Sequence, residues 1–223
     1  MSTHNPYVKL PVEYRWLPLV KDLEFFAGEP PDFKNRGYYY NELPCPFSIT
    51  KVVDTRNDYA KRVMEETRHE WEPRGNIAHA CLEAHLRGRS YDPGEYKDLV
   101  DHLVNFWLWD EWEAIACEYV MFDKRRCIAG TADMILRNKE DHSRIAIADL
   151  KTCKTKINKR NISAQLVGYV NLLNLTWYQI NVTDCFGVWA CPTKTDVEVY
   201  DPMDCLLTYE GMRDSFMRKQ REF

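Results

Sequence analysis

The stretch GTADMILRNKEDHSRIAIADLKT (residues 130–152) consists of two apolar runs separated by a polar turn, and each run carries one aspartate. Alternation and β-branched residues predict two strands joined as a hairpin. Because the turn is centred near residues 140–141, folding would bring Asp133 opposite Asp149, to within a residue or two. A buried carboxylate is costly unless it finds a partner, and like charges directly opposite destabilise a sheet. The arrangement therefore requires something between the two aspartates.

A divalent cation bound between the two carboxylates would replace their repulsion with attraction to the shared ion. Carboxylate oxygens are the ligands that Mg²⁺ prefers, and the ion usually keeps several waters. Lys151 shares a strand face with Asp149, so its ammonium could orient a water and stabilise charge on a phosphate. The alternative is that one aspartate ends its strand in solvent and pairs with a lysine, and that Lys151 is a surface residue.

Around this hairpin, helical and strand patterns alternate, which predicts an α/β fold with a mixed central β-sheet flanked by helices. Residues 1–45 are rich in aromatics, prolines and turn formers and are expected to be an irregular N-terminal extension, followed by one domain over 46–223. FSITKVV (47–53) is a short β-branched run. Strands are expected over 114–122, 126–137, 143–151, 186–192 and 196–201. Helices are expected over 57–72, 75–88, 94–112, 163–175 and 203–222.

Composition narrows the class of protein. A chain of 223 residues can bury a sizeable core. The net charge of −4 argues against general nucleic-acid binding but is compatible with a local basic patch. No apolar run is long enough to span a bilayer, and the N-terminus has no signal-peptide pattern. We therefore expect a cytoplasmic protein (host cytoplasm if viral) that contacts no membrane and keeps its eight cysteines reduced.

GTAD on one strand and IADLKT on the next resemble the core of the PD-(D/E)XK nuclease superfamily, which has a restriction-endonuclease-like core. The closer resemblance is to its RecB-like branch, which includes Cas4-like, phage-type and mitochondrial genome maintenance exonucleases. That branch carries a histidine on an upstream helix, and RGNIAHACLE supplies His79. It also carries Q-x-x-x-Y after the lysine strand, and AQLVGYV supplies Gln165 and Tyr169. LPCPFSITKVV resembles the segment before the histidine helix in phage members.

The resemblance, over about residues 40–200, implies a role for each of these residues. The implied metal ligands are His79, Asp133, Asp149 and the carbonyl of Leu150, holding one or two Mg²⁺ or Mn²⁺ ions. The implied catalytic residues are Asp133, Asp149, Lys151, Gln165 and Tyr169. Helix packing is the alternative for the last two. Some relatives bind an iron–sulfur cluster through closely spaced late cysteines, but the expected CxxC is absent, so we expect no cluster here.

The sequence leaves the roles of two glutamates undecided. Glu83 lies one helical turn from His79 and shares its face, and Glu118 lies on the first predicted strand of the meander. Either could contact the metal ligands, although an ordinary salt bridge is the favoured interpretation for both.

The run KTCKTKINKR (151–160) contains five basic residues and no acidic one. Beyond Lys151, its basic side chains could neutralise DNA phosphates beside the cut site, or the run could be a solvated loop. Arg74 is a further phosphate candidate. The aromatic cluster FWLWDEW (106–112) could stack on unpaired bases, although helix-spaced tryptophans more often belong to a core. The proposed DNA-binding set is Arg74, Lys154, Lys156, Lys159 and Arg160.

The resulting expectation is a metal-dependent deoxyribonuclease, an exonuclease that hydrolyses phosphodiester bonds from DNA ends and leaves 5′-phosphates. It would act in DNA recombination, repair or replication, in a phage, on linear DNA and with a recombination or replication protein as a further partner. A structure-specific endonuclease on the same core is the first alternative. A module that binds DNA ends without cutting is the second.

Overall fold

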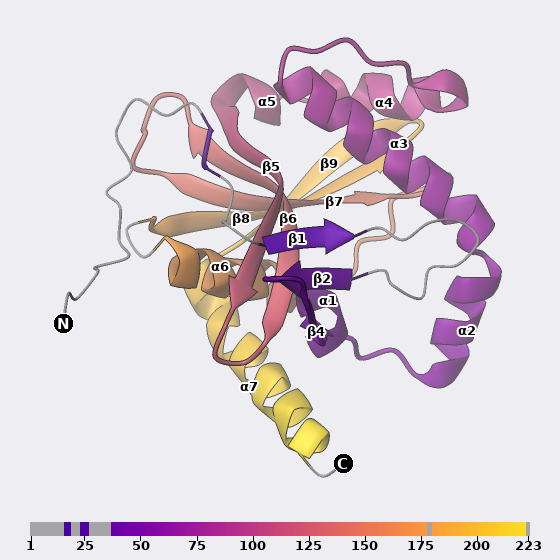
Figure 1. Ribbon diagram of the computed structural model, residues 1–223. Helices are drawn as coiled ribbons and strands as arrows, with labels where there is room; N and C mark the ends of the chain where they lie inside the picture. Colours follow the sequence, from indigo (N-terminus) through magenta and orange to yellow (C-terminus); the bar gives the residue numbers. More distant parts are fainter. Residues whose placement is uncertain (1–15, 19–22, 27–36, 178–179, 222–223) are drawn as a thin grey trace.

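The computed structural model describes residues 16–18, 23–26, 37–177 and 180–221 and has an α/β architecture (Figure 1). Its centre is a six-stranded mixed sheet in the order β4-β6-β7-β8-β9, with β5 paired to β6. The strands are β4 (Phe47–Ser48), β5 (Trp112–Asp123), β6 (Ile128–Asn138), β7 (Ile145–Thr152), β8 (Val182–Cys191) and β9 (Lys194–Tyr200). Helices flank this sheet on both faces, which confirms the predicted fold class.

The two faces of the sheet bury two separate apolar cores. The first core includes side chains of α3, α4 and α5, and the second includes side chains of α6 and α7 (Figure 1). Since β5, β6, β7 and β8 are buried on both sides, their sequences read as nearly continuous apolar runs. The flanking helices are α3 (Arg68–Leu86), α4 (Lys97–Val104), α5 (Leu108–Glu111), α6 (Ser163–Thr176) and α7 (Pro202–Arg221).

The predicted antiparallel meander is present as β5, β6 and β7. Met134 pairs with Ala148 across β6 and β7, and extending this register by one residue places Asp133 opposite Asp149, as the sequence predicts. From β7 the chain passes through α6 to β8, which runs parallel to β7. A tight turn then leads to the antiparallel β9.

One edge of β6 is interrupted, and this interruption creates the site. β5 pairs along the whole of β6, so β4 and β7 must share the other edge. On that edge β7 pairs with residues 134–137 and β4 with residues 128–129. Residues 130–133 lie between the two ladders, where β6 and β7 diverge. Asp133 is the last residue of this gap.

Two glycines allow the helical layer to approach the gap closely. A Cβ atom on Gly130 would lie 2.9 Å from Ile49 Cγ1 and 3.0 Å from Tyr169 Cε1. A Cβ atom on Gly168 would lie 2.8 Å from Ile49 Cγ2 and 3.0 Å from Tyr209 Cε2. Glycine at both positions therefore lets α6 pack against β6 and α1 (Ile49–Val52), which brings Tyr169 beside the site.

A small antiparallel sheet precedes the main one. It consists of β1 (Leu23–Phe26), β2 (Gly37–Tyr40) and β3 (Leu43–Cys45), and Figure 1 shows β1 and β2 in front of β5 and β6. The β2–β3 turn has Asn41 and Glu42 at φ 48° and 65°, as two-residue hairpins require. The prediction of irregular structure is therefore wrong for these strands, because the turn lacks the usual glycine signal. The rest of 1–45 lies largely outside the described residues, and the domain boundary stays a prediction.

Three other predicted elements differ in the structure. Only Phe47 and Ser48 of the 47–53 run are extended, because the Ser48 hydroxyl accepts from Lys51 N–H and caps α1 (Ile49–Val52). The predicted helix over 57–72 ends early, at Glu66, as α2 (Asp58–Glu66), and its last residues join the predicted 75–88 helix in the single helix α3. The predicted 94–112 helix is divided. Its parts are a 3-10 turn η1 (Gly94–Tyr96), α4 and α5.

The side chain of Asn105 explains where α4 ends. Its amide donates to the carbonyl of Asp101 at 2.8 Å, and such local bonds compete with continuing helix. The indole of Trp109 donates to the carbonyl of Leu103 at 2.6 Å and bridges the break. Trp112 then begins β5 instead of ending a helix.

Two chemical features of the described chain bear on its class. No helix within the described ranges is both long and apolar enough to cross a membrane. All eight cysteines carry free thiols.

Candidate metal centre

Asp133 lies at the point where β6 and β7 diverge. Its Oδ2 accepts a hydrogen bond of 2.6 Å from the backbone N–H of Leu150, so a side-chain carboxylate takes the place of a ladder acceptor. In an extended strand the N–H and C=O of one residue point to the same side, so the Leu150 carbonyl also faces the gap. Burial raises the pKa of Asp133, and His79 and Lys151 oppose that rise.

Asp149 is almost completely buried, with 1% of its surface exposed. Its Oδ1 accepts from the Gln165 side-chain amide at 2.8 Å, and the same amide donates to the Tyr169 hydroxyl at 2.9 Å. The Lys151 ammonium forms an ion pair with Oδ2, which otherwise has no hydrogen-bond partner. Burial raises the pKa of Asp149 to about 6, although Lys151 lowers it. The structure thus brings these four predicted residues together.

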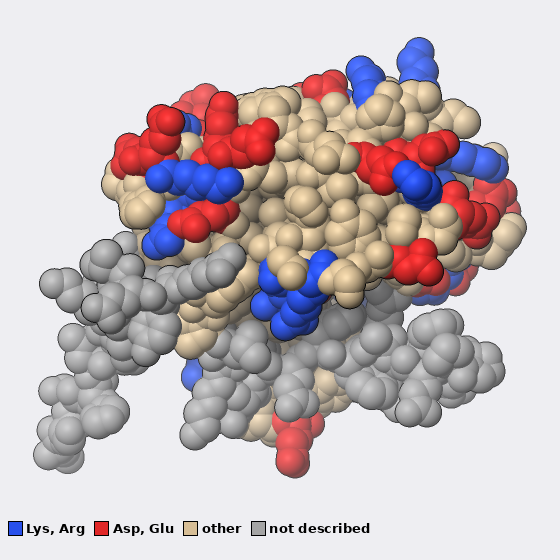
Figure 2. Space-filling view, turned by 90° about the horizontal axis from the view of Figure 1, so that it is seen from above, with Lys and Arg blue, Asp and Glu red and all other residues tan. Residues whose placement is uncertain are grey.

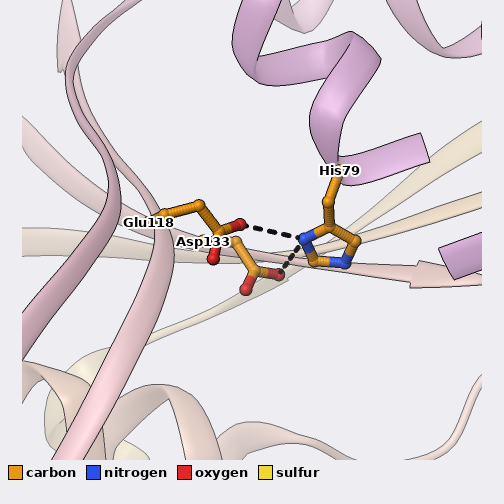
Figure 3. Close-up of side chains that lie close together, drawn as sticks. All are labelled: His79, Glu118 and Asp133. Atoms are coloured by element: carbon orange, nitrogen blue, oxygen red, sulfur yellow. Dashed lines mark hydrogen bonds and ion pairs between the residues drawn. The ribbon is translucent and has the colours of Figure 1, made fainter. Parts of the chain in front are cut away.

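His79 projects from α3 toward Asp133 and Glu118 (Figure 3). Its Nδ1 lies 3.2 Å from Glu118 Oε1 and 3.8 Å from Asp133 Oδ2. Burial alone would lower the pKa of His79, but Asp133, Glu118 and Asp149 outweigh that effect and raise it to about 9. The ring therefore stands in a strongly negative environment, such as a cation would neutralise.

Glu118 reaches this cluster through a kink in β5. Its φ is 48°, a conformation that is costly for a residue with a Cβ atom. Cys117 packs in the α3-side core and Tyr119 in the α6-side core, although side chains two apart in a regular strand share a face. The kink therefore switches the faces of the strand and turns Glu118 toward His79.

Sequence reasoning favoured an ordinary salt bridge for Glu118, whereas the structure places it against His79 beside Asp133. One ligand atom from each of these three residues lies within 4.8 Å of the others. A signal was present in the sequence, since Glu118 is an isolated acid inside the apolar run AIACEYVMF, just as Asp133 is in its own strand. Glu83 differs, because it is paired with Arg87 at 2.8 Å.

The cluster fits a divalent cation by its chemistry. A small cleft is lined by the polar side chains of His79, Glu83, Glu118 and Asp133 and by the apolar residues Leu82, Cys117, Met134 and Leu150. Carboxylate oxygens together with one imidazole nitrogen are common ligands of divalent cations. The buried Asp149 Oδ2 without a hydrogen bond is the kind of atom that a cation would satisfy.

The basic side chains proposed for DNA contact divide into three groups. Arg74 Nε donates to Thr152 Oγ1 at 3.4 Å, and Lys154 pairs with Glu70 at 2.8 Å, so both lie between α3 and the end of β7. Lys159 turns away to Asp196 on β9 at 3.0 Å. Lys156 and Arg160 are exposed.

Figure 2 shows the face over α3–α5, where acidic and basic side chains are interspersed among the residues in view. Nonspecific phosphate binding typically uses a surface of one charge, which this face does not provide within the described part of the chain. Among the clustered tryptophans, Trp109 and Trp112 belong to the core, while Trp107 is 48% exposed. Core packing therefore accounts for two of the three.

The fold and the cluster together define an α/β protein with a recessed histidine–carboxylate site suited to a divalent cation. No family model matches the sequence, and no curated protein matches it. One similar solved structure is that of SSO0001, with 17% identity, 74% of each chain covered and a TM-score of 0.39. Another is a candidate exonuclease from Eubacterium rectale, with 13% identity, 78% of this chain and 79% of that chain covered, and a TM-score of 0.48. Similarities at this level do not define a family.

Proposed function

We propose that this protein is a metal-dependent deoxyribonuclease. The observation that carries the proposal is the convergence of His79, Glu118 and Asp133 with the buried Asp149–Lys151 pair at one gap in the sheet. These residues come from α3 and three strands. A cluster of this kind costs stability unless a ligand compensates it, so its presence favours function over packing. The motif order described from the sequence supports phosphodiester hydrolysis.

The ligands proposed for the cation are His79, Asp133, Asp149 and the Leu150 carbonyl, with Glu118 added from the geometry. A bound Mg²⁺ or Mn²⁺ would act as a Lewis acid on the phosphodiester and supply a nucleophile at neutral pH.

The remaining polar residues orient the reacting groups. Gln165 holds Asp149 Oδ1 and is itself fixed by Tyr169, so the carboxylate has one orientation. Lys151 can move its ammonium from Asp149 to a phosphate oxygen, where negative charge increases in the transition state. Arg74 and Lys154 would bind backbone phosphates of the DNA where the strand runs past the end of β7. Lys156 and Arg160 are exposed on the loop that follows and would extend that contact.

The finer proposal is an exonuclease that acts on linear DNA ends in recombination, repair or replication. A partner from recombination or replication, a phage origin and a domain beginning near residue 46 belong to the same proposal and rest on the sequence resemblance.

Digestion of linear and covalently closed circular DNA tests the proposal. With Mg²⁺ the protein should degrade end-labelled linear DNA and leave closed circles intact, and EDTA should abolish degradation. Asp149→Ala should lower the rate by about a hundredfold or more, because it removes a ligand, while Glu140→Ala in the exposed β6–β7 turn should not. Rapid nicking of circles would favour the endonuclease alternative. Binding of ends without any metal-dependent cleavage would favour the non-cutting module.

A further inference from the structure

The small N-terminal sheet brings a tyrosine to the rim of the gap. The Tyr38 hydroxyl on β2 lies 3.0 Å from Thr131 Oγ1. Thr131 lies on β6, two residues before Asp133, within the stretch that has no ladder partner on the β7 side. Figure 1 shows β2 in front of β5 and β6, below α3. The Tyr38 hydroxyl therefore lies beside the gap, where burial raises its pKa and the nearby charges of Glu118 and Asp133 raise it further.

The chemistry of a phenol suits this position. Tyr38 is a neutral hydrogen-bond donor at pH 7, so it can approach a phosphate without competing with a cation for the carboxylates. Its partly buried ring keeps the hydroxyl in place against Thr131. A hydrogen bond to a charged acceptor is about twice as strong as one between neutral groups. Exchange of the Thr131 hydroxyl for a phosphate oxygen would consequently be favourable.

We propose that Tyr38 is a substrate-contacting residue whose phenolic O–H donates to a phosphate oxygen of the DNA strand bound at the metal centre. The proposal rests on the proposed nuclease function and deepens it, because it makes the N-terminal sheet one wall of the nucleic-acid site. It also assigns a task to a segment that the sequence motifs do not include.

A purely structural role for Tyr38 gives a different expectation. If Tyr38 only ties the N-terminal sheet to β6 through its hydrogen bonds to Thr131, Tyr38→Phe should lower the melting temperature and leave KM unchanged. If Tyr38 contacts the substrate, loss of the Thr131 hydroxyl leaves the phenol able to bind phosphate. The pair Tyr38→Phe and Thr131→Val therefore separates the two roles.

The strand supplies a matched control. Tyr40 lies two residues along β2, and its ring contacts Phe122, with centroids 5.2 Å apart, and the Lys124 ammonium. Phenylalanine can make both of these ring contacts. Tyr40→Phe therefore repeats the same chemical change on the same strand without touching the gap.

The experiment measures kcat and KM for a fluorescein-labelled DNA oligonucleotide with Mg²⁺, together with the melting temperature of each variant. Tyr38→Phe should raise KM about tenfold at nearly constant kcat, as loss of a ground-state contact to a charged group does. Thr131→Val and Tyr40→Phe should stay within about twofold of the wild type. The salt dependence of KM should be unchanged in Tyr38→Phe, because no cation is removed.

Two results would overturn the inference while leaving the nuclease proposal intact. One is a Tyr38→Phe variant with wild-type KM. The other is a Thr131→Val variant that loses as much affinity as Tyr38→Phe. A wild-type protein that neither binds nor cleaves the oligonucleotide overturns both proposals, so the two failures are distinguishable.

Discussion

At the scale of single residues, Asp149 and Lys151 form the most costly contact in the site. The carboxylate is buried, it accepts one bond from Gln165, and its other oxygen faces only the ammonium. A buried ion pair of this kind seldom adds stability compared with apolar residues. The pair has a physical reason if, during the reaction, Asp149 also binds the cation and Lys151 also contacts a phosphate oxygen of the substrate.

Lys151→Ala should lower kcat far more than it weakens DNA binding, because the ammonium acts mainly on charge that develops in the transition state. Lys154→Ala is the matched control. Lys154 is exposed and paired with Glu70, so its loss should weaken binding and reduce the salt dependence while leaving kcat nearly unchanged. Steady-state kinetics at several salt concentrations measure both effects. Parallel losses of rate and affinity in both variants would make Lys151 an ordinary phosphate contact.

Glu118→Gln keeps the size of the side chain and removes its charge. If Glu118 helps to hold the cation, the Mg²⁺ concentration for half-maximal cleavage should rise by about tenfold or more, the usual effect of a lost metal-site contact. Glu83→Gln is the comparison, because Glu83 lines the same cleft but is paired with Arg87. A magnesium titration of cleavage measures the difference. If both variants shift the half-maximal Mg²⁺ concentration equally, Glu118 contributes only to the overall negative charge of the cleft and does not contact the cation.

At the scale of elements, the close contact of β6 with α6 positions the site. Gly130→Ala would place a methyl group 2.9 Å from Ile49 and 3.0 Å from Tyr169, both of which are buried. Overpacking of this kind costs about 1–3 kcal/mol of unfolding free energy. Chemical denaturation should show that loss, together with reduced cleavage as Tyr169 shifts. If Gly130→Ala were as stable as the wild type, α6 and β6 could move apart without loss of packing, and their close contact would not position the site.

Gly168→Ala provides the comparison on the helix. Its new methyl group would meet Ile49 at 2.8 Å, but alanine gains about 1 kcal/mol of helix propensity over glycine. The net loss of stability should therefore be smaller than for Gly130→Ala. The reverse order would show that the slightly closer contact at Gly168 outweighs its gain in helix propensity.

The elements also show what sequence reasoning can and cannot reach. Alternation and the polar turn were sufficient to predict the β6–β7 hairpin and the register that sets Asp133 opposite Asp149. Periodicity could not predict that β5 kinks at Glu118, because a positive φ at a glutamate has no sequence signal. For this reason Glu118 was underestimated as a member of the site.

The same limit applies to helix boundaries and to small sheets. The break between α4 and α5 depends on the side chains of Asn105 and Trp109, which donate to nearby backbone carbonyls. The apolar spacing of this segment fits one long helix equally well, so periodicity does not reveal the break. The β2–β3 turn depends on Asn41 and Glu42 in left-handed conformations without glycine. Local pattern cannot distinguish such cases from irregular chain.

At the scale of the whole molecule, the site lies where three packed parts meet. The α3 layer brings His79, the sheet brings the carboxylates and Lys151, and α6 brings Gln165. Each side chain is therefore fixed by a different part of the fold, which preorganises the cluster. Assembly of the site consequently depends on the packing of both cores and does not arise from any one segment of the chain.

Binding of Mn²⁺ followed by the electron paramagnetic resonance signal of the free ion tests the central claim most directly. The wild-type protein should remove Mn²⁺ from solution saturably, and Asp133→Ala, checked for folding by circular dichroism, should lose that binding. Glu140→Ala, at the opposite end of the same hairpin, should bind as the wild type does. Equal binding by wild type and Asp133→Ala, or no saturable binding by the wild type, would contradict a metal centre at this gap.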